Sequence, residues 1–170
     1  ETANHFGLWR KSKQREQLSN QEQIMREAVI VSTARTPLTK SHRGEFNATP
    51  GPQLAAYSVK AAVERSGIDP ELIEDLVMGC GYPEGITGKN IGRQTALRAG
   101  LPLSVAGMVA SRFCASGLQS VAIAAGRIVA EGVPAMVAGG VESISAIRAG
   151  NPADIDPWLQ EHKPNLYMAM

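Results

Sequence analysis

Cys114 is the residue in this sequence best placed to do chemistry. It stands between an apolar run at 105–110, which predicts a strand, and a run of small and apolar residues to 130, which predicts a helix. At the start of a helix, unpaired backbone N–H groups and the helix dipole favour an anion. They would favour a thiolate, the nucleophilic form of cysteine, and could hold the oxyanion formed when a carbonyl is attacked. This placement predicts a cysteine nucleophile for acyl transfer.

The residues after Cys114 support this interpretation. Ala115 and Ser116 are small, and Gly117 allows a backbone or a ligand to approach closely. The alternative is that Cys114 packs as a small hydrophobe, as most free cysteines do. We expect that packing role for Cys80, which closes a predicted buried strand. The two cysteines have no metal-ligand spacing and form no disulfide framework.

Composition excludes several classes of protein. The chain has 170 residues and a net charge of +1, which indicates one domain without the strong field typical of nucleic-acid or acidic-membrane binding. No apolar run approaches the roughly 20 residues that span a bilayer. The small number of cysteines favours a reducing compartment, and we expect a cytoplasmic protein.

The first 24 residues differ from the rest. They are rich in Gln, Lys, Arg, Ser and Asn, and they lack the apolar core of a secretory signal. Their acidic residues argue against a transit peptide. Met25 directly precedes an apolar run, so we expect Met25 to be the biological start and residues 1–24 to be a disordered or non-native extension.

Strand and helix patterns alternate along the remaining chain, which predicts βαβ units and a largely parallel sheet. Sites in such sheets gather at the carboxyl ends of strands, and Cys114 directly follows the third predicted strand. The predicted strands are Ala28–Val31, Leu76–Gly79, Val105–Ala110 and Ala135–Ala138. The predicted helices are Pro52–Arg65 (ended by Gly67), a short Pro70–Ile73, Asn90–Ala99 and Cys114–Ala130.

The last of these helices is apolar on every side. Between Val121 and Ala130 only Arg127 is strongly polar. A helix of this kind is typically buried, yet a single sheet covers only one of its faces. We therefore expect a second layer of protein on its other face.

Four segments together resemble the thiolases, the acetyl-CoA acetyltransferases. Residues 112–119, Arg-Phe-Cys-Ala-Ser-Gly-Leu-Gln, resemble the active-site cysteine motif of that family. Residues 28–37 resemble its opening strand and Ala-Arg-Thr-Pro turn, and residues 88–94 the start of its second helix. Residues 138–145 resemble its Gly-Gly-x-Glu-x-Met-Ser segment. All four occur in family order at family spacing, over about residues 26–170. Ser111 departs from the usual Asn, and Ile144 from the usual Met.

The resemblance implies a fold and a reaction. Thiolases have five layers, α-β-α-β-α, from two similar halves, and the nucleophile helix lies in the central layer. The expected fold class is α/β, the thiolase-like N-terminal half, with a mixed, mostly parallel sheet and a buried nucleophile helix. Cys114 would carry the acyl group between coenzyme A thioesters, by thiolysis of a 3-ketoacyl-CoA or condensation of acetyl-CoA, in fatty acid and lipid metabolism. Coenzyme A would be a substrate, with no cofactor or metal.

The resemblance also divides the chain and suggests partners. Residues 25–145 would form the N-terminal core domain, and residues 146–170 the start of the loop domain that covers the substrate. Met170 would be the methionine that lines the acyl pocket. The full-length protein would form a homodimer or homotetramer and would bind acyl-CoA and coenzyme A, without nucleic acid or membrane.

Some family motifs do not occur in this sequence. They are the Asn-Glu-Ala-Phe, Gly-His-Pro and Cys-x-Gly-Gly-Gly segments, which supply water positioning, the activating histidine and the second cysteine. None of His5, His42 and His162 has the Gly-His-Pro context, and His42 has no orienting acid beside it in sequence. We therefore expect the N-terminal half of a thiolase, incomplete as it stands and inactive alone. Two alternatives remain: a ketoacyl-synthase-type condensing enzyme, and a non-catalytic thiolase-like lipid-binding or partner module.

Overall fold

Three parallel strands carry the fold. The computed structural model describes residues 26–146 and 156–166. Strand β1 (Ile73–Gly79) lies in the centre of the sheet, between β2 (Ala106–Ala110) and β3 (Ala135–Gly140). All the described pairings are parallel, with Val77 opposite Met108 on one side and Ala138 on the other. The α/β class expected from the sequence is confirmed.

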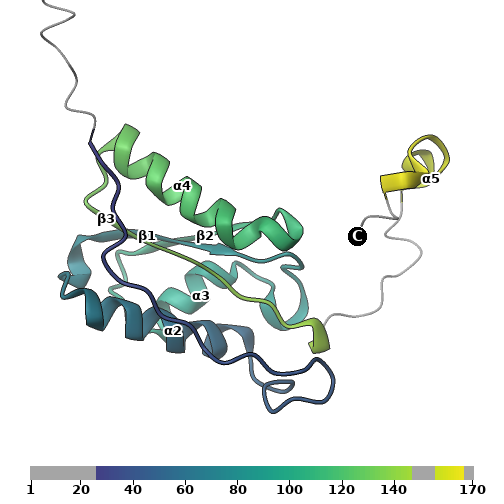
Figure 1. Cartoon of the computed structure of the whole chain (residues 1–170), viewed down its shortest axis with the longest axis horizontal. Coiled ribbons are helices and arrows are strands. Elements are labelled where there is room, and N and C mark those ends of the chain that lie inside the picture. Colours follow the sequence, from purple (N-terminus) through teal and green to yellow (C-terminus); the bar gives the residue numbers. More distant parts are fainter. Residues whose placement is uncertain (1–25, 147–155, 167–170) are drawn as a thin grey trace, which may run out of the picture.

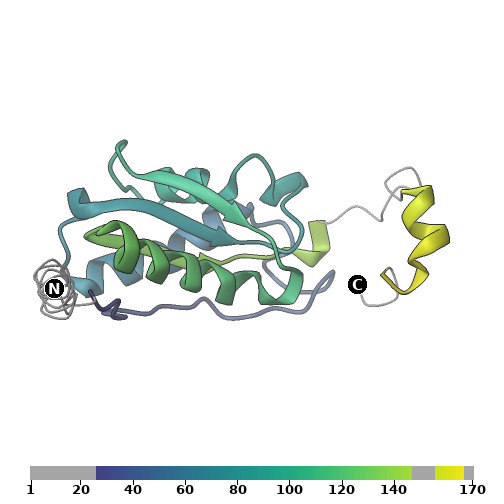
Figure 2. The same ribbon diagram turned by 90° about the horizontal axis from the view of Figure 1, so that it is seen from above.

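Helices cover both faces of this sheet (Figure 1). Helices α2 (Gly51–Ser66) and α3 (Ile91–Arg98) lie on one face, and α4 (Ser116–Glu131) lies on the other. Viewed from above, α4 runs along the strands (Figure 2). Because both faces are covered, the second half of β1 is apolar, and Leu76, Val77 and Met78 are at most 1% exposed.

Local sequence explains where the helices begin and end. α2 has a proline in its first turn and ends at Gly67, whose φ of 67° is the left-handed conformation that glycine adopts readily. α3 begins after Asn90, whose side chain accepts a hydrogen bond from the N–H of Arg93 at 3.1 Å. α4 also ends in a left-handed glycine, Gly132. These ends agree with the predicted ones to within one or two residues.

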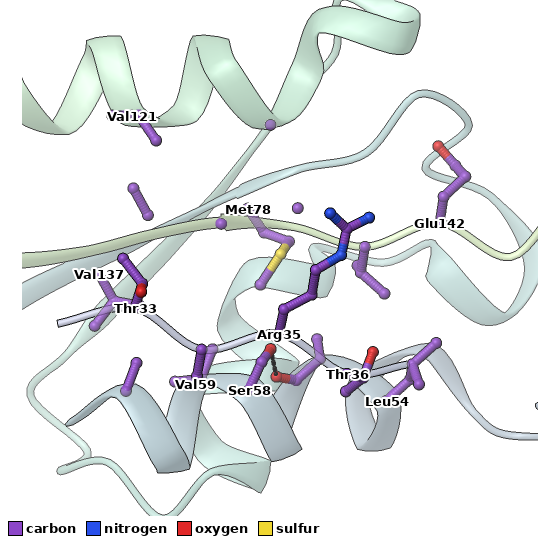
Figure 3. Close-up of a pocket in the computed structure, with 18 of the residues that line it drawn as sticks. Thr33, Arg35, Thr36, Leu54, Ser58, Val59, Met78, Val121, Val137 and Glu142 are labelled. Carbon is purple, nitrogen blue, oxygen red and sulfur yellow. Dashed lines mark hydrogen bonds between the residues drawn. The ribbon is translucent and has the colours of Figure 1, made fainter. Parts of the chain in front are cut away.

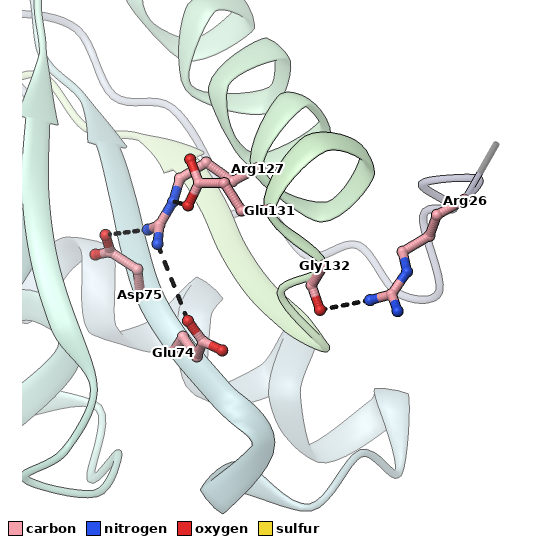
Figure 4. A network of polar contacts seen from close by, with 6 residues as sticks. All are labelled: Arg26, Glu74, Asp75, Arg127, Glu131 and Gly132. Atoms are coloured by element: carbon pink, nitrogen blue, oxygen red, sulfur yellow. Dashed lines mark hydrogen bonds and ion pairs between the residues drawn. The ribbon is translucent and has the colours of Figure 1, made fainter. Parts of the chain in front are cut away.

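Arg127, the one strongly polar residue between Val121 and Ala130, ties α4 to the sheet. Its Nη1 donates to the Oδ2 atom of Asp75 on β1 at 2.8 Å, and its Nε donates to the Oε2 atom of Glu131 at 2.8 Å (Figure 4). Glu74 lies further away, at 4.0 Å from Nη2. Nearby, the guanidinium of Arg26 donates to the backbone carbonyl of Gly132. The Asp75 side chain is only 10% exposed, so Arg127 neutralises a nearly buried carboxylate.

The side of α4 that faces away from the sheet is uncovered within the part of the chain that the structure describes. The buried residues of α4 are all small: Ser116, Ser120 and Ala124. Leu118 is 75% exposed and Val129 is 44% exposed. The helical run Phe113–Glu131 has 19 residues, and by length and composition alone it could cross a membrane. No membrane-spanning segment was expected from the sequence. Since one side packs on the sheet, we interpret it as a core helix with one face open.

The predicted strand Ala28–Val31 is wrong. The segment is extended but forms no strand, and Val29, Ile30 and Val31 are 59–75% exposed. A strand requires a hydrogen-bonded neighbour, and among the described residues no backbone hydrogen bond joins this segment to the sheet. A cavity of about 840 Å³ lies between residues 28–39 and the elements α2, β3 and α4.

The other differences concern boundaries. β1 begins three residues earlier than predicted, at Ile73, so the short helix before it, η1, is limited to Pro70–Leu72. β3 continues through both glycines to Gly140. The remaining short helices are η2 (Gly85–Thr87), η3 (Phe113–Ala115), η4 (Ile144–Ala146), α5 (Pro157–His162) and η6 (Pro164–Leu166). The extension 1–24, Met25, most of the expected loop-domain start at 146–170, and Met170 lie outside the described residues.

Candidate active site

The carboxyl ends of the three strands meet at one edge of the sheet, and the Cys114 turn follows one of them. β1 ends at Gly79 and leads into Cys80, whose N–H donates to the Ala110 carbonyl at the end of β2 at 3.0 Å. On the other side, the N–H of Val141 after β3 donates to the Gly79 carbonyl at 2.9 Å. The sequence therefore placed Cys114 correctly, after a strand at the edge where parallel sheets carry their sites.

Cys114 lies in the 3₁₀ turn η3, just before α4, rather than in the first turn of the α-helix as predicted. The residue before it, Phe113, has a φ of 46°, a left-handed conformation that is uncommon for a bulky side chain. Strain of this kind persists only where the surroundings hold it. The turn thus separates the end of β2 from the helix and leaves the Cys114 side chain exposed.

The hydroxyl of Ser116 holds this turn from inside. It accepts a hydrogen bond from the N–H of Arg112 at 2.8 Å and donates to the Phe113 carbonyl at 2.6 Å. Ser116 is only 3% exposed, and replacing its hydroxyl would leave the N–H of Arg112 without this partner. From the sequence, Ser116 was expected only to be a small residue beside Cys114. Its spacing of three from Phe113, typical of serine bonding back to a nearby carbonyl, was the available signal.

Glycine allows the start of α4 to approach the sheet. A Cβ atom on Gly79 would lie 2.4 Å from the backbone carbonyl atoms of Ser116, which no real side chain permits. One turn further along, the Ser120 hydroxyl donates to the Gly139 carbonyl of β3 at 2.8 Å. These contacts fix the helix start directly against the ends of β1 and β3 and set the position of Cys114 relative to the sheet.

The backbone N–H of Cys114 is available to a ligand. No hydrogen bond joins it to an acceptor among the described residues. An N–H at this position could donate to an oxyanion formed on a carbonyl that the Cys114 sulfur attacks. Cys114 thus has both an exposed thiol and a backbone N–H without an acceptor among the described residues.

Cys80 is a different kind of thiol. It is 1% exposed, which confirms the packing role expected from the sequence. Burial raises the pKa of the Cys80 thiol from 9.0 to about 11; a hydrogen bond with Thr87 opposes this shift, and the negative charge of Glu142 adds to it. Near neutral pH Cys80 is therefore a protonated, inaccessible group and a poor nucleophile.

Glu142 is a residue of this edge that the sequence analysis named only as part of a motif. It follows β3 and is exposed as a whole, yet its carboxylate accepts a hydrogen bond from the N–H of Gly81 at 2.6 Å. The contact spans 61 residues of sequence, so only the fold brings the two together. It links the ends of β3 and β1 directly beside the Cys114 turn.

The cavity beneath residues 28–39 lies next to this edge but does not contain the cysteine. Gly117 and Val121 of α4 line it, whereas Cys114 is not among its lining residues. Figure 3 shows Met78 and Val137 facing it from the sheet, and Arg35 reaching from the N-terminal segment toward the sheet. The hollow is therefore mainly apolar, with Arg35 as a cationic group at its wall.

The described histidines make contacts unrelated to Cys114. The backbone N–H of His42 donates to the Ser145 hydroxyl at 2.9 Å. His162 stacks on Trp158 within α5, with ring centroids 4.4 Å apart. His5 and Met170 lie outside the described residues. Among the residues that the structure describes, no three His, Cys, Asp or Glu side chains are grouped so that they could hold a metal ion.

Comparison with known proteins places these features in a family. The family model for the thiolase N-terminal domain matches residues 28–166. A 3-ketoacyl-CoA thiolase of Bacillus subtilis is 40% identical over 147 residues, which are 86% of this chain and 38% of the relative. An acetyl-CoA acetyltransferase of Cupriavidus necator is 43% identical over 122 residues, or 72% of this chain and 30% of the relative. A 3-ketoacyl-CoA thiolase of Acinetobacter baumannii is 35% identical over 137 residues, or 81% of this chain and 35% of the relative.

The chain spans about a third of the length of these relatives. The match begins at the extended segment 28–39 and includes all the strands that position the Cys114 turn. The chain belongs to the thiolase family, and it corresponds to the N-terminal domain of its members.

Proposed function

We propose that this chain is the nucleophile-bearing part of an enzyme that transfers acyl groups between coenzyme A thioesters. The observation that carries the proposal is the exposed Cys114 in a strained turn at the carboxyl edge of a parallel sheet, within a domain of the thiolase family. The curated relatives are named for 3-ketoacyl-CoA and acetyl-CoA chemistry, and this supports the same substrate class here.

The proposed reaction has two covalent stages. The Cys114 thiolate attacks the carbonyl of an acyl-CoA or the 3-keto group of a 3-ketoacyl-CoA, while the Cys114 N–H donates to the developing oxyanion. The carbonyl re-forms, coenzyme A or an acetyl-CoA carbanion leaves, and the acyl group is now a thioester on Cys114. It then passes to coenzyme A, or to an acetyl-CoA carbanion in the direction of condensation. Coenzyme A is a substrate in both directions.

The proton-transfer groups that this reaction needs would lie outside the chain. The described histidines are not arranged to activate Cys114, and Cys80 is buried and protonated, so neither is a suitable proton-transfer group. General acid–base groups typically contribute about 10²–10⁴-fold each. We therefore propose that the 170-residue chain alone has no useful turnover and that a second domain supplies these groups.

A hybrid enzyme tests the proposal. Residues 26–170 would replace the matching N-terminal region of the Bacillus subtilis relative, and thiolysis of acetoacetyl-CoA would be followed by loss of substrate absorbance. We expect turnover from the hybrid, none from the 170-residue chain, and none from the hybrid carrying Cys114→Ser. A folded hybrid with Cys114→Ser that retained turnover would refute the role of Cys114.

A further inference from the structure

The carboxylate of Glu142 fixes the loop that follows the neighbouring strand. Its Oε2 atom accepts from the N–H of Gly81 at 2.6 Å and more distantly from that of Tyr82 at 3.4 Å. Its Oε1 atom accepts from the Cys80 thiol at 3.6 Å. Hydrogen bonds from N–H groups to a charged acceptor are shorter and stronger than neutral ones, so the Gly81 contact is the principal one. An acid after β3 therefore sets the backbone after β1.

That loop in turn contacts the Cys114 turn. The carbonyl of Gly81 accepts from the Ser111 hydroxyl at 3.1 Å, and the ring of Tyr82 packs edge-on against that of Phe113, with centroids 5.9 Å apart. A Cβ atom on Gly81 would lie 2.8 Å from Glu142 Oε2 and 3.4 Å from the Phe113 Cα. Gly81 is therefore enclosed between the carboxylate on one side and the residue before the nucleophile on the other.

The conformation of Phe113 explains why this support is needed. Its φ of 46° is unfavourable for an L-residue and relaxes unless neighbouring groups hold it. Ser116 holds the turn from inside the helix. The Gly81–Tyr82 loop holds it from outside, through Ser111 and the Phe113 ring. Only the second support depends on a residue as distant in sequence as Glu142.

We propose that Glu142 is a positioning residue for Cys114, because its carboxylate fixes the Gly81–Tyr82 loop that holds the Phe113–Cys114 turn in place. This inference rests on the proposed role of Cys114 as the nucleophile. Glu142 acts through Gly81 and Tyr82. The protonated Cys80 thiol contributes by donating to the same carboxylate.

The test uses a reaction that requires no acyl-CoA. The rate constant for alkylation of Cys114 by iodoacetamide is measured in the 170-residue chain, with the modified peptide identified by mass spectrometry. We expect Glu142→Ala to slow alkylation about 3- to 10-fold, the loss typical of one hydrogen bond, since a relaxed turn no longer presents the thiol at the helix start. Glu142→Gln keeps one acceptor oxygen and should recover most of the rate. Glu71→Ala removes an exposed acid on η1 and should change nothing.

A double-mutant cycle separates positioning from a general loss of structure. Gly81→Ala adds a Cβ atom that displaces the Glu142 carboxylate, so it should slow alkylation as Glu142→Ala does. In the Glu142→Ala background the same Gly81→Ala change should have little further effect, because the displaced group is already absent. Far-UV circular dichroism and amide protection of β1 verify that each variant is folded.

Several results would overturn the inference. One is an unchanged alkylation rate in folded Glu142→Ala, and another is an equal effect of Gly81→Ala in both backgrounds. If Glu142→Ala does not fold, the alkylation rates of folded Gly81→Ala and Glu142→Gln decide instead. A wild-type rate in Gly81→Ala contradicts the inference. A slowed rate in Gly81→Ala, together with a wild-type rate in Glu142→Gln, supports it. Failure of the wild-type hybrid enzyme to accept an acyl group would refute the proposed function while leaving this alkylation test intact.

Discussion

Cys114 is exposed and Cys80 is 1% exposed, so the two thiols of this chain meet different environments. The positions of both thiols were predictable from sequence, because each depends on the local strand and the residues beside it. The roles of Ser116 and Glu142 were missed for different reasons. The Ser116 hydroxyl had a local signal that was not used, whereas the Glu142 contact with Gly81 depends on pairing of distant strands.

The Cys80 thiol makes stability depend on alkaline pH. Its pKa is raised from 9.0 to about 11 in the folded chain, so between these values the unfolded chain binds fewer protons than the folded one. The free energy of unfolding should therefore fall as pH rises through this window, by at most about 1.4 kcal/mol per pH unit from this group. Below pH 9 the contribution is fully present.

Urea unfolding of wild type and Cys80→Ala measures this contribution. The difference in unfolding free energy between the two proteins should decline between pH 9 and pH 11, since the variant lacks the thiol while all other titrating groups are shared. A difference that stays constant over that range would show that the Cys80 thiol is not shifted by burial.

At the scale of elements, periodicity and glycine punctuation predicted β1, β2, β3 and the helices between them. The prediction failed at 28–31, where an apolar run was read as a strand although the described chain has no strand beside it. Apolar sequence indicates that a segment can be buried in a sheet, but a strand exists only when a neighbour pairs with its backbone. That neighbour is a property of the whole fold.

Hydrogen exchange distinguishes the extended segment from a strand. Backbone amides of residues 29–31 should exchange rapidly, because none is paired with the sheet, whereas those of residues 76–78 in β1 should be strongly protected. Equal protection of the two segments in the 170-residue chain would show that residues 28–31 do form a strand.

The Arg127 network should anchor α4 to the sheet. Arg127→Ala leaves the Asp75 carboxylate nearly buried and without its cation, and should lower the free energy of unfolding by about 3 kcal/mol. Glu131→Ala removes a partner that is 55% exposed and should cost less than about 1 kcal/mol. Denaturant titrations of both variants test this. Equal losses of unfolding free energy would show that the Arg127–Asp75 pair stabilises the chain no more than the exposed Arg127–Glu131 pair does.

At the scale of the whole molecule, α4 presents one apolar face to the sheet and another to solvent. Burying a side chain such as Leu118 or Val129 stabilises by about 1.5–3 kcal/mol, and both are exposed here. Covering the open face of α4 with another protein surface would therefore be strongly favourable. Exposed apolar faces of this kind mark interfaces or aggregation sites. We therefore expect the 170-residue chain to associate with itself.

Sedimentation velocity at micromolar concentration should detect this association. Leu118→Glu combined with Val129→Glu places charges on the open face and should shift the chain toward monomer, while Cys114 alkylation remains. A wild-type chain that stays monomeric, with α4 amides well protected, would indicate that the chain covers this helix by itself.

The most direct measurement of the central claim is the location of the acyl group on the protein. The hybrid enzyme is mixed with acetoacetyl-CoA, quenched in acid during turnover and digested, and the acetylated peptide is identified by mass spectrometry. The acyl group should lie on Cys114, should be retained in Cys80→Ser and should be absent in Cys114→Ser. An acetyl group found on Cys80, or a turning-over enzyme with none on Cys114, would contradict the assignment of Cys114 as the nucleophile.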